Sequence, residues 1–76
     1  RMIEIYGKEN CGYCNMAKNL LKSKNITFEE DNIEDHPEAR DFAINEGHRT
    51  MPQIYINEKK VGGFDQLKKY DLSNIQ

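Results

Sequence analysis

Two cysteines three positions apart are the residues whose type and spacing could do chemistry in this chain. Cys11 and Cys14 are the only cysteines among the 76 residues. Side chains three positions apart share one face of a helix, so one thiol can attack a mixed disulfide held on the other. A disulfide between them would close almost no loop and would add little stability. The pair therefore favours a redox role in a reducing compartment over a structural crosslink.

Two other interpretations stay open when the motif is taken alone. The pair could be half of a zinc site, or two inert thiols in a core. A closed zinc site needs four ligands, but the remaining candidates, His36 and His48, are twelve residues apart and neither forms a second close ligand pair. We therefore expect no metal site. The place of Cys11 after a strand and at a helix start favours the redox interpretation.

The residues around the pair predict a strand followed by a helix. Residues 2–6 alternate in hydrophobicity as a strand does. Apolar side chains then recur at helical spacing over residues 13–24, at Tyr13, Ala17, Leu20 and Leu21. Free backbone amides and the helix dipole at this N-terminus stabilise a thiolate on Cys11, and Lys8 adds positive charge. We assign Cys11 as the nucleophile and Cys14, one turn inside the helix, as the more buried resolving thiol.

The rest of the chain completes the element order βαβαββα. The pattern predicts a strand over 26–33, a helix from Pro37 to about Glu46 with Gly47 after its end, a hairpin over 53–62, and a last helix that places Phe64, Leu67 and Tyr70 inward. Residues 73–76 have little to bury and are expected to fray.

This order predicts the α/β class. The first βαβ unit implies parallel strands with a right-handed crossover, and the hairpin adds antiparallel strands beside them. We expect one domain over residues 1–76, with a four-stranded mixed sheet flanked by helices.

Two loops carry further candidate site residues, each with an ordinary alternative. Pro52 could be cis and leave the Met51 backbone free beside Cys11, or it could be a trans proline that starts a strand. Gly62-Gly63 precedes a helix whose first amides could hold a carboxylate, whereas Asp65 could be only a helix cap.

Four segments together resemble the glutaredoxin family. They are Lys8, Cys11-Gly12-Tyr13-Cys14, Thr50-Met51-Pro52 and Gly62-Gly63-Phe64-Asp65, in the right order over nearly the whole chain. The resemblance implies the thioredoxin fold, a cis Pro52 opposite the cysteines, and glutathione as the co-substrate. The chain departs from the family pattern at two positions. Gly12 replaces the common proline and is expected to loosen the active-site turn, and Met51 replaces valine.

The resemblance also implies a set of glutathione contacts. These expected contacts are Lys8, Tyr13, Thr50, Met51, Pro52, Gly63, Phe64 and Asp65. A side chain of the second helix often assists in the family, and Arg40 is the nearest candidate, with Arg49 as the second.

The expected activity is glutathione-dependent reduction of protein disulfides and glutathione mixed disulfides. Ribonucleotide reductase is a frequent target of small dithiol glutaredoxins. One alternative, motivated by Gly12, is a dimer that shares a [2Fe-2S] cluster through one Cys11 from each chain and two glutathione thiols. Another is a thioredoxin-like electron donor that takes its electrons from a reductase and ignores glutathione.

Composition limits the setting in which this chemistry takes place. With 37% apolar and 32% charged residues and a formal net charge of −2, the chain has neither a membrane-spanning apolar run nor a basic stripe for nucleic acid. Its first residues enter a strand directly and do not follow the pattern of a secretory signal. We expect a cytoplasmic monomer.

Overall fold

The computed structural model describes residues 2–47, 50–73 and 75, which form seven elements around one sheet. The elements are β1 (Ile3–Gly7), α1 (Gly12–Ser23), β2 (Glu29–Asn32), α2 (Pro37–Asn45), β3 (Gln53–Ile56), β4 (Lys59–Gly62) and α3 (Phe64–Lys69). The strand order is β2-β1-β3-β4, with β2 parallel to β1 and both other pairs antiparallel. The predicted element order and the four-stranded mixed sheet are confirmed. No helix in the described part of the chain is long and apolar enough to cross a membrane.

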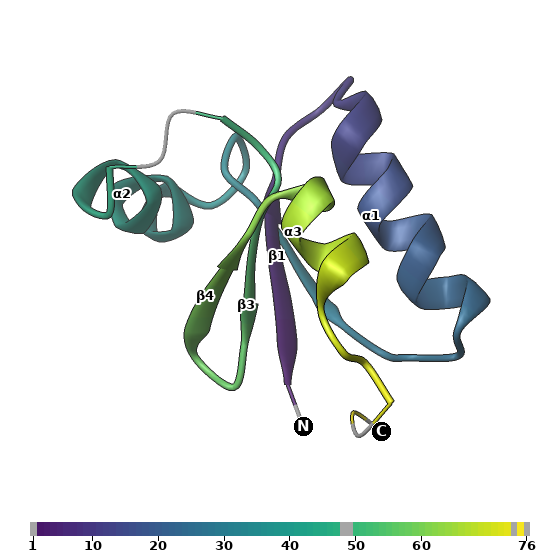
Figure 1. Cartoon of the computed structure of the whole chain (residues 1–76). Helices are drawn as coiled ribbons and strands as arrows, with labels where there is room; N and C mark the ends of the chain where they lie inside the picture. Colours follow the sequence, from purple (N-terminus) through teal and green to yellow (C-terminus); the bar gives the residue numbers. More distant parts are fainter. Residues whose placement is uncertain (1, 48–49, 74, 76) are drawn as a thin grey trace.

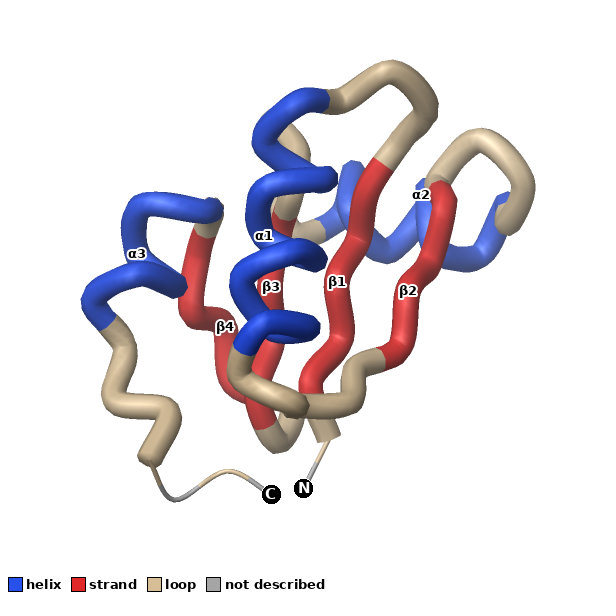
Figure 2. Tube along the Cα trace, turned by 90° about the vertical axis from the view of Figure 1, so that its right-hand side faces the viewer, coloured by secondary structure: helices blue, strands red, loops and turns tan. Residues whose placement is uncertain are grey.

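Helices cover both faces of the sheet. Figures 1 and 2 show α1 and α3 side by side on one face and α2 on the opposite face. The face under α1 and α3 holds the main core, because β1 and β3 both turn alternate isoleucines toward it. The largest side chains there that are less than 2% exposed are Ile3, Ile5, Leu21, Ile54 and Leu67. This packing fixes the start of α1 relative to the end of β1.

The face of the sheet that α2 covers carries aromatic side chains. The Phe42 ring of α2 lies 5.2 Å from the Tyr6 ring of β1 and 5.5 Å from the Tyr55 ring of β3, measured between centroids. Burial raises the pKa of both tyrosine hydroxyls. Ala39 and Ala43 of α2 are buried, whereas Phe42 is half-buried.

Glu4 is a half-buried carboxylate next to other acidic residues. Burial raises its pKa, and the nearby carboxylates of Asp31, Glu29 and Glu58 raise it further. Glu4 and Glu29 are direct neighbours across the parallel β1–β2 pair. Like charges in such a position weaken a sheet.

A two-residue turn joins β3 to β4. Asn57 and Glu58 both have positive φ, 52° and 70°, which is the requirement of a type I′ hairpin turn. Asn57 also bonds to Met2, because its amide donates to the Met2 carbonyl at 2.9 Å and its Oδ1 accepts from the Met2 amide at 3.2 Å. Asn57 suits this conformation, but Glu58 carries a Cβ that disfavours it.

Several predicted details differ from the structure, and one is confirmed. The strand expected over 26–33 forms ladder pairs only from Glu29 onward, because Ile26 is instead buried in the core and its amide donates to Leu21 O at 3.0 Å. Tyr70 is 42% exposed, since α3 ends at Lys69 before its ring can turn inward. Gly47, in contrast, has the expected positive φ, 75°, just past α2.

The expectation that residues 73–76 have little to bury is wrong for Ile75. This side chain is only 6% exposed and belongs to the core cluster between the sheet and its helices, together with Leu72. The segment after α3 therefore returns to the core, and its apolar side chains extend the surface that α1 and α3 cover.

Candidate active site

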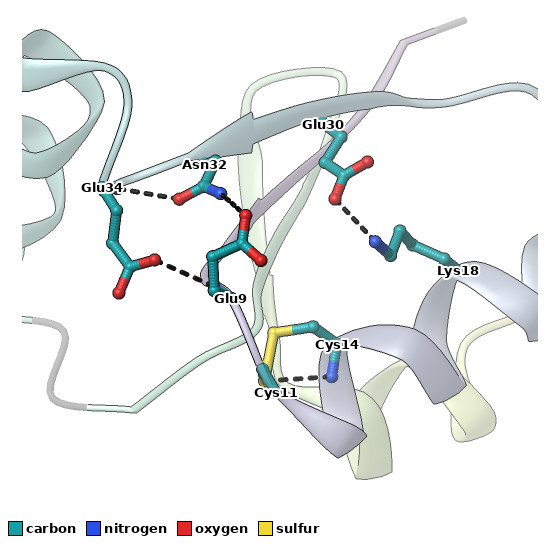
Figure 3. Close-up of polar contacts among 7 residues, drawn as sticks. All are labelled: Glu9, Cys11, Cys14, Lys18, Glu30, Asn32 and Glu34. Carbon is teal, nitrogen blue, oxygen red and sulfur yellow. Dashed lines mark hydrogen bonds and ion pairs between the residues drawn. A yellow bond between two sulfur atoms is a disulfide. The ribbon is translucent and has the colours of Figure 1, made fainter.

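Cys11 begins α1 and caps it with its own sulfur. Its backbone is extended, with φ −112° and ψ 105°, and its Sγ accepts a hydrogen bond from the Cys14 amide at 3.2 Å. Cys11 and Cys14 are disulfide-bonded, with their Cα atoms 5.2 Å apart (Figure 3). Cys11 is 8% exposed and Cys14 3%. The structure thus places the first sulfur at the helix N-terminus and the second deeper.

A small polar network holds the loop that leads from β1 to Cys11. The Glu9 amide donates to Glu34 Oε1 at 3.1 Å, and Asn32 Nδ2 donates to Glu9 Oε2 at 3.4 Å. Asn32 Oδ1 also accepts from the Glu34 amide at 2.8 Å (Figure 3). The end of β2 and the residues after it therefore position the loop before the nucleophile.

The loop before β3 brings a backbone carbonyl to the disulfide. The Met51–Pro52 peptide bond is cis, as the resemblance implied. Met51 O lies 3.7 Å from Cys11 Sγ. Gln53 is buried, and its Nε2 donates to Thr50 O at 2.8 Å, which ties this loop to the first residue of β3.

A cavity of about 470 Å³ opens beside this loop. It is lined by Lys8, Tyr13, Thr50, Met51, Pro52, Gly63, Phe64, Asp65 and Gln66. The structure therefore brings eight of the nine expected glutathione contacts to one place, from three separate parts of the chain. The ninth, Arg40, is exposed on α2 and is not among the lining residues. Arg49 lies outside the described residues.

Two aromatic side chains that line the cavity lie close together, and a lysine outside the lining contacts one of them. The rings of Tyr13 and Phe64 lie 6.2 Å apart between centroids. Lys68 Nζ lies 4.9 Å from the Phe64 ring centroid and 3.5 Å from Asp65 Oδ1. Tyr13 shares the helical spacing of the buried Ala17 and Leu21, but its side chain is 61% exposed and stands at the cavity rim.

Gln66 is a lining residue that the sequence analysis missed. Its Oε1 accepts a hydrogen bond from the Gly63 amide at 2.9 Å. This is the return contact of a capping box, in which the third helical residue bonds the backbone of the residue before the helix. The Gly63-x-x-Gln66 spacing carried this signal. Gly62 must also be small there, because its φ is 124° and an added Cβ would lie 3.0 Å from Gln66 Oε1.

The described residues contain no cluster of metal-ligating side chains. Within residues 2–47, 50–73 and 75, no group of three or more His, Cys, Asp or Glu side chains could hold a metal ion. The chemistry that the described site offers is that of its two sulfurs.

The fold and the capped Cys-x-x-Cys pair define a thiol–disulfide oxidoreductase of the thioredoxin fold. The chain belongs to the glutaredoxin family, since the family model Glutaredoxin matches residues 3–61. It is 43% identical over 70 residues to glutaredoxin 3 of Escherichia coli strain K12, covering 91% of this chain and 84% of the relative.

Similarity extends to the glutaredoxin-like NrdH proteins. The chain is 36% identical over 63 residues to glutaredoxin-like protein NrdH of Lactococcus lactis, covering 83% of this chain and 88% of the relative. The solved structure of NrdH-redoxin from Escherichia coli, described as having a thioredoxin-like activity profile, superposes with a TM-score of 0.82 at 25% identity, covering 93% and 96%. These matches support the thioredoxin fold.

Proposed function

We propose that this chain is a glutathione-dependent oxidoreductase that reduces protein disulfides and glutathione mixed disulfides. The observation that supports glutathione is the cavity of about 470 Å³ lined by Lys8, Tyr13 and the Met51 loop, whose carbonyl lies beside Cys11. Small-molecule sites occupy about 300–1,000 Å³. A cavity of this size suits a tripeptide whose sulfur must meet Cys11.

The lining residues suit the two ends of glutathione. Lys8 is exposed at the cavity and would pair with one terminal carboxylate. The other carboxylate would accept from the amides of Phe64 and Asp65, since Gln66 already occupies the Gly63 amide. The cysteinyl backbone would pair with Met51 as an added strand.

Cys11 alone is sufficient for the reaction with a glutathione mixed disulfide. Its thiolate attacks the glutathione sulfur, the new Cys11–glutathione disulfide forms, and the old disulfide bond breaks to release the partner as a thiolate that takes up a proton. A second glutathione thiolate then attacks the glutathione sulfur of that adduct. The two glutathione sulfurs form glutathione disulfide, the bond between Cys11 and glutathione breaks, and Cys11 is released as a thiolate.

A protein disulfide needs both cysteines. Cys11 attacks one target sulfur and releases the other as a thiol. Cys14 then attacks the sulfur of Cys11, which forms the Cys11–Cys14 bond present in the structure and expels the second target thiolate. Two glutathione molecules reduce this bond and become glutathione disulfide.

Two cysteine variants test this proposal. The assay follows reduction of a glutathionylated low-molecular-weight disulfide, with glutathione, glutathione reductase and a nicotinamide cofactor supplying electrons. Cys14→Ser is expected to keep this activity and to lose most reduction of a protein disulfide, whereas Cys11→Ser loses both. Activity retained in Cys11→Ser would refute the assignment of the nucleophile.

A reductase-fed electron donor is the second candidate. The observation that favours it is the similarity to the NrdH-redoxin of Escherichia coli, at a TM-score of 0.82. The two candidates differ in the electron source, so the purified chain is assayed with glutathione alone and with thioredoxin reductase alone. Reduction that requires the reductase and ignores glutathione would replace our proposal with this one.

The iron–sulfur dimer has its own measurement. It needs Cys11 from each of two chains, and a Cβ on Gly12 would meet no atom within 4 Å, so the turn beside Cys11 is open. Anaerobic reconstitution with iron, sulfide and glutathione is expected to leave a colourless monomer. Visible absorption together with a dimer would establish the cluster instead.

The setting of the activity is also part of the proposal. We place the protein in the cytoplasm, where thiols are kept reduced. Its targets are disulfide-containing or glutathionylated proteins, and ribonucleotide reductase is the first one to assay.

A further inference from the structure

Gly7 lies beside the side chain of Cys14. It is the last residue of β1, it is buried, and a Cβ built on it would lie 3.2 Å from Cys14 Sγ and 3.6 Å from Cys14 Cβ. Carbon atoms in contact prefer about 3.5–4.0 Å, and sulfur is larger than carbon. A side chain at position 7 would therefore press on the Cys14 sulfur, which would have to shift by a few tenths of an ångström.

Backbone conformation does not explain this glycine. Among the five glycines, all of them described, only Gly47 and Gly62 have positive φ. Gly7 pairs in regular parallel register with Asn32, and its carbonyl accepts from the Ile33 amide at 2.9 Å. An L-residue can adopt this strand conformation, so the requirement at position 7 is for space next to Cys14.

We infer that Gly7 is a positioning residue for Cys14, because the absence of a side chain at position 7 leaves room for the Cys14 sulfur where it bonds Cys11. The inference rests on the proposed role of Cys14 as the resolving thiol. In the disulfide, the Cys14 sulfur cannot rotate away from position 7 without breaking its bond to Cys11. In the dithiol it can turn about its Cα–Cβ bond. A methyl group at position 7 therefore disfavours the disulfide more than the dithiol.

The first test measures this equilibrium directly. Wild type and Gly7→Ala are equilibrated in buffers of fixed reduced and oxidised glutathione, quenched with acid, alkylated and quantified by mass. The ratio of disulfide to dithiol is expected to fall about threefold to tenfold in the variant, which matches the cost of one side chain held off its rotamer. An unchanged or raised ratio would overturn the inference. This readout does not depend on activity, so it stands even if the proposed glutathione-dependent turnover is not found.

The second test separates positioning from general damage to the fold. Gly7→Ala is expected to slow protein-disulfide reduction, which needs Cys14, about threefold to tenfold, and to leave reduction of a glutathionylated small substrate unchanged. In the Cys14→Ser background, Gly7→Ala should have no effect on the latter activity. Equal loss of both activities would show that the glycine is needed only for stability.

A third variant covers the case in which Gly7→Ala does not fold. Cys14→Ala removes the sulfur that the new methyl would meet, so the double variant Gly7→Ala/Cys14→Ala should recover the stability of Cys14→Ala alone. The measurement is thermal unfolding of both proteins. A double variant that still fails to fold would mean that the methyl collides with something other than Cys14, and the inference would be wrong.

Discussion

Replacing Lys8 by glutamine tests whether the cavity beside Cys11 binds a carboxylate. Lys8 is exposed and lines the cavity, so its pairing with a ligand takes place close to water. Ion pairs of this kind contribute about 0.2–1 kcal/mol, which corresponds to about 1.4-fold to fivefold in affinity. We expect Lys8→Gln to raise KM for a glutathionylated substrate by this factor at low salt.

Salt should remove most of that difference. The Debye length shortens from about 30 Å at 0.01 M to about 3 Å at 1 M, so the advantage of wild type over Lys8→Gln should shrink in steady-state assays across this range. A difference in KM that persists at high salt would mean that Lys8 contributes through shape or hydrogen bonding.

Lys22→Gln is the matched control for this experiment. It removes the same charge from an exposed lysine in the last turn of α1, at the end of the helix away from Cys11. KM should remain at the wild-type value. Equal effects of the two variants would reflect only the change in net charge and would refute a local ion pair between Lys8 and the glutathione carboxylate. An unchanged KM in Lys8→Gln would refute carboxylate binding by Lys8.

Three further predictions concern stability. Glu58→Gly removes the Cβ that disfavours the positive φ in the hairpin turn, so it should raise the free energy of unfolding in urea by about 0.5–1 kcal/mol. A lower free energy of unfolding would show that Glu58 is not strained in this turn. Because the pKa of Glu4 is raised in the folded state, stability is lost as pH rises through that pKa. Glu4→Gln should therefore raise the melting temperature at pH 7 but not below about pH 4, and an equal gain at both pH values would exclude this cause. Ile75→Ala should cost at least about 2 kcal/mol in the same urea experiment, whereas a frayed end would give no change.

Local periodicity was sufficient to predict most of the fold. The alternation in β1 and the 3.6-residue spacing in α1 reflect burial against one neighbouring layer, and they identified both elements within a residue or two. Ile26 and Ile75 were misjudged for one shared reason. Each is an apolar residue outside any regular element, and whether it meets the core depends on the tertiary path of the chain.

Sequence motifs and the family resemblance predicted the candidate site more fully than hydrophobic periodicity or residue chemistry did. The Cys-x-x-Cys spacing defined the nucleophile and its partner, but only the family resemblance connected Lys8 with residues more than forty positions away. Gly7 could not be recognised, because a glycine at a strand end has no pattern until the neighbouring Cys14 sulfur is placed. Gln66 was recognisable from its capping-box spacing and was overlooked.

The sulfur that caps α1 couples folding to oxidation state. A thiolate is a stronger acceptor for the Cys14 amide than a disulfide sulfur, because hydrogen bonds to charged acceptors are about twice as strong as neutral ones. The first turn of α1 should therefore be tighter in the reduced protein, with slower hydrogen exchange at the Cys14 amide. By thermodynamic linkage, the same free energy favours reduction of the folded chain. Because stabilising the reduced form weakens the tendency of the pair to give up electrons, the helix start makes this dithiol a milder reductant than an uncapped pair would be.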